Sequence, residues 1–111
     1  EQLGGTDTGP NPVEQILGAL GNCLAVGYAA NATAAGITLN AMTIEVEGNL
    51  DLHSFLGLRD GHAGFSDITA RVRIDSDGSE EALQALHEKV VATSPVGHTL
   101  GRAVPLSVTL G

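Results

Sequence analysis

Cys23 is the only cysteine of the 111-residue chain, and its residue type allows two uses. A free thiol reacts as a nucleophile when a nearby cation or a helix break favours the thiolate, and otherwise it packs as a small hydrophobic side chain. No His, Lys or Arg lies within one helical turn of Cys23 in the sequence. Residue chemistry alone therefore leaves both uses open. A single cysteine excludes an internal disulfide and favours a reducing, cytoplasmic compartment.

Two further side chains are weighed as partners for Cys23. Glu14 lies nine residues earlier, which on a helix places it about 180° away around the axis and roughly 13 Å away along it. Glu14 is therefore interpreted first as a residue that starts a helix. Val13, ten residues before Cys23, would look along nearly the same flank. Ser94 precedes Pro95 and is interpreted by default as a helix-terminating residue.

Other kinds of site find little support in the sequence. The four histidines lack the spacing of a metal site, and no second cysteine joins them. No phosphate-binding glycine loop follows a strand, and no serine or cysteine lies in a nucleophile elbow. We therefore expect neither a metal nor a cofactor. The net charge of -8, with five scattered basic residues, argues against nucleic acid or an anionic membrane as partner.

A long helix must position Cys23. Asn11 can cap it, Pro12 suits its first position, Glu14 complements its amino-terminal dipole, and Gly36 is a plausible stop, so the sequence predicts a helix over residues 12–35. The uncharged stretch 16–35 is long enough to raise the question of a membrane span. Its richness in Ala and Gly, its polar residues and its lack of flanking Lys or Arg argue against that interpretation.

The predicted helix carries apolar or small side chains around its whole circumference. A helix of this kind must be covered on all sides. A chain of 111 residues with two Phe, one Tyr and no Trp has little material to do so alone. A second copy of the chain is the simplest cover, and the sequence therefore predicts a homodimer.

Alternation of apolar and polar residues predicts the remaining elements. One strand begins at Leu39, a second covers residues 68–75, and a glycine-rich loop over 52–66 joins them, its apolar residues docking on the body. Residues 77–79 start a second helix that ends near Thr93. A short helical turn to Gly101 and a terminal strand over residues 104–110 follow. This order predicts one α+β domain covering residues 1–111.

Five segments, in order along the chain, carry a resemblance to a known superfamily. They are GPNPVE at residues 9–14, ALGNCL at 19–24, EGNLDL at 47–52, FLGL at 55–58 and SPV at 94–96. Together they resemble the OsmC and organic-hydroperoxide-resistance proteins over essentially the whole chain. The resemblance implies an OsmC-like fold, an intertwined homodimer in which sheets wrap two long central helices.

The resemblance also implies a chemistry. In peroxide-reducing members a cysteine on the central helix attacks the hydroperoxide and becomes sulfenic acid, and a second cysteine before Pro-Val resolves it. Cys23 matches the first cysteine, while Ser94 occupies the position of the second. Val13 stands where the hydroperoxide-resistance branch has a glutamate, with Glu14 one place later. The family's amino-terminal strands, which carry an arginine, would precede residue 1.

Three hypotheses follow from these observations. In the first, Cys23 reduces peroxides in a one-cysteine, peroxiredoxin-like cycle in the oxidative stress response, and an external thiol is the reductant because Ser94 cannot close a disulfide. In the second, the chain is a non-catalytic dimer that binds an apolar small molecule in an interfacial pocket, with Cys23 as its wall or sensor. In the third, the dimer is purely structural.

Overall fold

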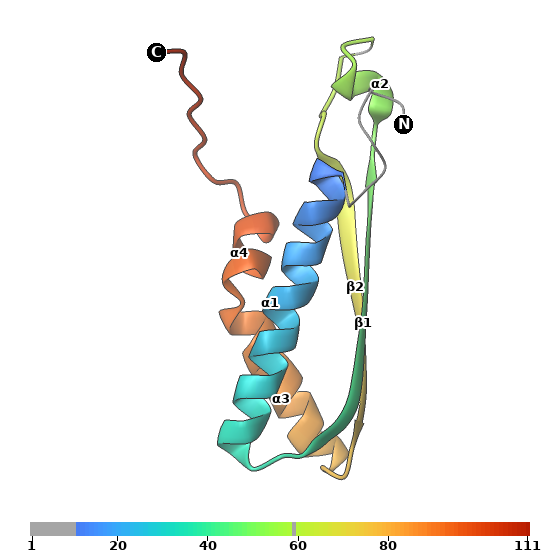
Figure 1. The fold of residues 1–111 in the computed structure, drawn as a ribbon, viewed down its shortest axis with the longest axis vertical. Helices are drawn as coiled ribbons and strands as arrows, with labels where there is room; N and C mark the ends of the chain where they lie inside the picture. The colour runs from blue at the N-terminus through green and yellow to red at the C-terminus, as the bar shows by residue number, and fades with distance from the viewer. Residues whose placement is uncertain (1–10, 59) are drawn as a thin grey trace.

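The computed structural model describes residues 11–58 and 60–111, which form an α+β structure (Figure 1). The elements, in chain order, are α1 (Pro12–Ala35), β1 (Leu39–Leu50), α2 (Leu52–Phe55), β2 (Phe65–Ser76), α3 (Glu80–Thr93) and α4 (Pro95–Gly101). The predicted α+β class is confirmed. The glycine and proline of the GPNPVE segment, Gly9 and Pro10, lie outside the described residues.

Helix α1 has the bounds that its terminal residues predict. Asn11 caps the helix by accepting a hydrogen bond from the Glu14 backbone N–H, and the Glu14 side chain accepts one in return from the Asn11 backbone N–H. This reciprocal pair satisfies two amino-terminal donors that the helix leaves without partners. At the other end, Gly36 adopts a left-handed conformation with φ of 72°, which glycine reaches without a steric penalty.

Strands β1 and β2 form a two-stranded antiparallel sheet, in which Ile44 pairs with Val72 and Glu45 with Arg71. Alternate side chains of β1 are half-buried on the inner face, which lies against α1. The outer face is polar, and there the Arg73 guanidinium lies 3.7 Å from the Glu45 carboxylate between two exposed side chains. Such an exposed pair contributes little to stability.

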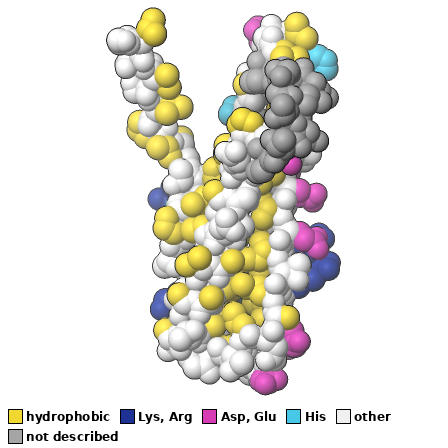
Figure 2. Space-filling model, in the orientation of Figure 1, with side chains coloured by type: hydrophobic (Ala, Val, Ile, Leu, Met, Phe, Trp, Pro, Cys, Tyr) yellow, Lys and Arg dark blue, Asp and Glu magenta, His cyan; other side chains and the backbone are white. Residues whose placement is uncertain are grey.

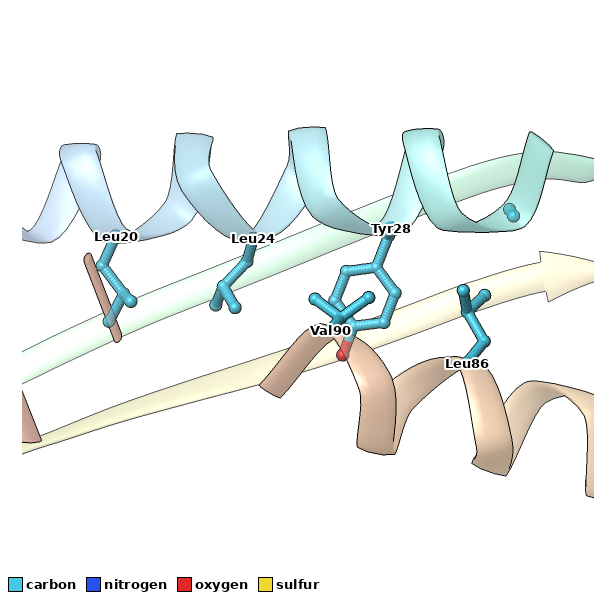
Figure 3. Packing of buried hydrophobic residues seen from close by; sticks show 6 residues of the cluster. Leu20, Leu24, Tyr28, Leu86 and Val90 are labelled. Carbon is cyan, nitrogen blue, oxygen red and sulfur yellow. The ribbon is translucent and has the colours of Figure 1, made fainter. Parts of the chain in front are cut away.

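The core lies between α1, α3 and the inner face of the sheet. Four α1 side chains at a spacing of four residues point to one side, and two α3 side chains meet them (Figure 3). These buried residues are Leu20, Leu24, Tyr28, Ala32, Leu86 and Val90. Gly27 permits the close approach of the two helices, because a Cβ at this position would lie 3.0 Å from a methyl group of Val90.

Two sequence-based expectations are wrong for the described single chain. Residues 104–110 form no strand; they extend away from the body as a tail in which Leu106 and Val108 are each 86% exposed (Figure 1). In the connection between the strands, Leu56 and Leu58 do not dock but are exposed, and a short helix, α2, occupies part of the predicted loop. Alternating apolar residues need a neighbouring strand, and no described segment supplies one to the tail.

The far side of α1 is uncovered in the described part of the chain. Val26, near the middle of the helix, is 69% exposed, and Ile16 is also exposed. Hydrophobic side chains extend over the face shown in Figure 2, whereas acidic and basic side chains gather along the flank formed by the sheet. Across the described residues, no helix combines the length and hydropathy required to cross a membrane.

Candidate functional site

The structure brings Cys23 and Ser94 together although 71 residues separate them. The Cys23 Sγ atom lies 3.4 Å from the Ser94 Oγ atom, a distance at which either group can donate a hydrogen bond to the other. Cys23 is half-buried on α1, one residue before the core residue Leu24, while Ser94 is 5% exposed. The thiol is therefore partly accessible, and its polar neighbour is almost completely withdrawn from solvent.

Ser94 lies at the junction of two helices. It follows the last residue of α3 and caps α4, where its Oγ accepts a hydrogen bond of 3.0 Å from the Gly97 backbone N–H. Its carbonyl oxygen accepts a further bond from His98 N–H. The interpretation of Ser94 as a helix-terminating residue is confirmed. Because α4 packs against α1, this cap also directs the hydroxyl toward Cys23.

Glu14 is not brought to Cys23. Its side chain takes part in the Asn11 capping box at the exposed start of α1, which confirms its interpretation as a helix-start residue. It also borders a groove that does not include Cys23. Among the described residues no hydrogen bond or ion pair connects Glu14 to the thiol. The structure therefore gives Glu14 no direct part in thiol chemistry within a single chain, and the neighbouring Val13 is exposed.

The groove lies between α1 and β1 and has a volume of about 490 Å³. Its α1 side includes the small residues Gly18, Gly21 and Ala25, together with Asn22, and its floor is formed by Met42, Ile44 and Val46 of β1. The groove is open to solvent, and its lining combines apolar side chains with a comparable share of polar surface, to which Glu14 and Asn22 contribute. A small molecule or a packed protein segment could occupy such a groove.

A second polar contact, between Tyr28 and His87, was not anticipated from the sequence. The Tyr28 hydroxyl lies 2.5 Å from His87 Nδ1, and the two rings are 19° from parallel with centroids 6.1 Å apart. Tyr28 is fully buried, and burial raises the pKa of its phenol because the charged form loses hydration. The residues are 59 positions apart, so no sequence pattern links them.

Charged groups that could act on Cys23 are lacking in the part of the chain that the structure describes. Its sulfur has no hydrogen bond or ion pair with Lys, Arg or His there, and no group of three His, Cys, Asp or Glu residues is arranged to hold a metal. What the described arrangement offers chemically is one thiol with a fixed hydroxyl beside it.

The sequence model of the OsmC-like protein family matches residues 5–109. This match covers nearly the whole chain, so the chain belongs to the OsmC-like family, as the five sequence segments indicated. No curated protein matches the chain.

Solved structures share its fold. An OsmC-like protein from Mycoplasma pneumoniae is 26% identical, with a TM-score of 0.75, over 85% of this chain and 64% of its own. An OsmC-like hydroperoxide resistance protein from Jannaschia sp. CCS1 is 19% identical, with a TM-score of 0.73, over 96% and 70%. An OsmC-like protein of unknown function from Vibrio cholerae is 14% identical, with a TM-score of 0.65, over 85% and 60%. The chain therefore spans less than two thirds of the Mycoplasma protein.

Proposed function

We propose that the protein is a thiol-dependent peroxide reductase of the oxidative stress response, with Cys23 as the attacking thiol. The observation that carries the proposal is the contact between Cys23 and Ser94, because the resemblance to the peroxide-reducing members puts their two cysteines at these two positions. Membership of the OsmC-like family supports it, as does the fold shared with a hydroperoxide resistance protein. A reducing cytoplasm is the compartment that suits this chemistry.

The proposed cycle has three steps, and atoms and electrons balance in each of them. The Cys23 thiolate attacks the peroxide oxygen of ROOH, the O–O bond breaks, and sulfenic acid and an alkoxide form; the alkoxide takes a proton and leaves as ROH. An external thiol then attacks the sulfenic sulfur, which releases water and leaves a mixed disulfide. A second external thiol displaces Cys23 and is oxidised to the disulfide. Ser94 cannot replace these external thiols, because a hydroxyl does not form a disulfide.

The test is peroxide consumption with dithiothreitol as reductant, using cumene hydroperoxide and hydrogen peroxide in parallel. Native protein should consume peroxide catalytically, and Cys23→Ser should fall to the rate without protein. Ser79→Ala, which removes a serine cap at the start of α3, is the matched control and should retain the native rate. Equal rates for native protein and Cys23→Ser would remove the proposal.

We further propose that the functional unit is a homodimer. The described residues leave large apolar side chains in water, among them Val26 of α1, which is 69% exposed, and Leu106 and Val108 of the tail, each 86% exposed. Burial of such apolar surface is the main driving force for the association of two subunits. The uncovered side of α1 and the apolar tail of residues 103–111 are the surfaces that a second copy would cover.

Sedimentation at micromolar concentration should give twice the chain mass of 11.3 kDa. Val26→Lys places a charge on the uncovered side of α1 and should convert the dimer to monomer, because a buried unpaired ammonium is costly. Gln84→Lys adds the same charge to an exposed position of α3 and serves as the control. A native protein that sediments as a monomer would contradict this proposal.

The groove between α1 and β1 supports a second candidate function, the binding of an apolar small molecule without catalysis. Its volume of about 490 Å³ falls within the range of ligand pockets. Bound ligand would raise the melting temperature, and the rise would grow with the logarithm of the ligand concentration once that concentration exceeds Kd. Mass spectrometry of the native protein should then reveal a co-purifying ligand. A protein without such a ligand, and without thermal response to fatty acids or other apolar compounds, would exclude this function.

A further inference from the structure

Ser94 differs chemically from the second thiol that the resemblance places at its position, and its geometry gives it a separate use. We propose that Ser94 is a positioning residue that donates its hydroxyl hydrogen to the Cys23 sulfur in the thiolate form, and so stabilises the form of the side chain that attacks. The reaction that this thiolate performs rests on the proposed function. The hydrogen bond itself can be tested without any peroxide.

The hydrogen-bonding capacity of the Ser94 hydroxyl determines its direction. A serine hydroxyl has one hydrogen to donate and two lone pairs to accept with. The Gly97 backbone N–H, 3.0 Å away, can only donate, so it occupies a lone pair of Oγ. The hydroxyl hydrogen has one acceptor among the described residues, Cys23 Sγ at 3.4 Å. With a neutral thiol either group can donate, but a thiolate has no hydrogen, and Ser94 must then be the donor.

The surroundings of Cys23 leave this contact without charged competitors. The β1 side chains that face α1 are aliphatic, and the buried residues of α3 are Leu86 and Val90. The remaining titratable groups on the facing sides of these elements are Tyr28 with its partner His87, and the half-buried His98 of α4. None of the three has a hydrogen bond or an ion pair with Cys23. The Ser94 hydroxyl is thus its one polar contact in the described part.

The Ser94 hydrogen bond changes the reaction rate of Cys23 in two opposing ways, which together set the size of the expected effect. A hydrogen bond to a charged acceptor is stronger than one to a neutral acceptor, which amounts to a preference of roughly tenfold for the thiolate over the thiol. A stabilised thiolate is also a weaker nucleophile, and the usual dependence, a slope of about 0.4 to 0.5, lowers its intrinsic rate about threefold. The net gain at pH 7 is therefore about threefold. At pH 9.5, where an ordinary thiol is already mostly ionised, only the loss of nucleophilicity remains.

Thiol–disulfide exchange with a small disulfide, 2-hydroxyethyl disulfide, measures these two effects directly, because the chain has one cysteine and the rate reports Cys23 alone. We expect Ser94→Ala to react about threefold more slowly than native protein at pH 7 and about threefold faster at pH 9.5. Ser94→Gly should show the same crossing of rates, slower than native at pH 7 and faster at pH 9.5. Glycine is tolerated at a helix cap, so this variant removes the hydroxyl while it largely preserves the cap. Ser79→Ala, a cap far along the sequence from Ser94, should follow the native profile at both pH values.

The crossing between the rate–pH profiles of the native protein and the Ser94 variants distinguishes a hydrogen bond to the thiolate from a purely structural role of Ser94. If Ser94 merely fills space, its removal exposes the sulfur, and both variants react faster at pH 7 and at pH 9.5. If it merely caps α4, Ser94→Gly follows the native profile. Either result, or unchanged rates in both variants, overturns the proposal. Failure of the peroxidase test with an intact crossing would instead leave the hydrogen bond in place and remove the proposed reaction.

Discussion

Replacing Ser94 with cysteine should create a disulfide with Cys23. The native Sγ to Oγ distance is 3.4 Å, so the two sulfur atoms must approach by somewhat more than 1 Å to reach the bond length of about 2.05 Å. The bond would close a loop across 71 sequence positions, for which the chain-entropy term gives about 4.4 kcal/mol of stabilisation at most. Loss of the serine cap on α4 costs about 1 kcal/mol, leaving a net gain near 3 kcal/mol.

The assay compares urea unfolding of Ser94→Cys with and without dithiothreitol and counts free thiols after mild oxidation. Oxidised variant should contain no free thiol and unfold at higher urea than the native protein, whereas reduced variant should unfold at lower urea. Ser79→Cys introduces a cysteine at the equivalent cap of α3 and should keep two free thiols. If Ser94→Cys also keeps two free thiols and shows no response to reductant, the juxtaposition of α1 and α4 is refuted.

Three further predictions concern the core and the sheet. Burial raises the pKa of Tyr28, so above about pH 10 the tyrosine ionises in the unfolded chain before it ionises in the folded one. The free energy of unfolding should therefore fall more steeply with pH in native protein than in Tyr28→Phe. Because the chain has one tyrosine, absorbance at 295 nm should show directly that it titrates late. Leu24→Ala should lose about 2–5 kcal/mol in urea unfolding, while Val91→Ala, at a half-exposed site, should change by less than about 0.5 kcal/mol. Gly48→Ala should lower the melting temperature, because the added Cβ would lie 2.7 Å from the Phe65 ring; an unchanged value would contradict this packing.

Local sequence signals account for most of the fold because they act through local bonds. The bounds of α1 follow from Asn11 at one end and Gly36 at the other, and both caps involve residues within five positions of them. The alternation along β1 and β2 likewise predicts which side chains face α1. The tail of residues 104–110 alternates in the same way, yet it forms no strand, since alternation states which face is apolar and not which segment will pair with it.

The candidate site depends on long-range packing, which local patterns do not encode. Resemblance to a family singled out Cys23 and Ser94, but their contact at 3.4 Å arises because α3 returns along α1 and places α4 beside it. The same packing joins Tyr28 to His87, a pair that no motif predicts. Helical geometry alone predicted that Glu14 does not contact Cys23. A separation of nine residues on one helix places the two side chains on opposite sides, whatever the tertiary contacts.

The position of Cys23 on α1 links its chemistry to the assembly of the protein. The preceding turn contributes Leu20 to the core and the next residue is the buried Leu24, while Val26, less than one turn further, is 69% exposed. Cys23 thus lies at the border between the side of α1 that its own chain covers and the side that it leaves open. A second copy seated on the open side would reduce the access of large thiols to the sulfur while the bond from Ser94 persists. The monomeric variant Val26→Lys should therefore react faster than native protein with a bulky thiol reagent but at a similar rate with iodoacetamide. If the ratio of variant rate to native rate is the same for both reagents, the interface lies away from the thiol.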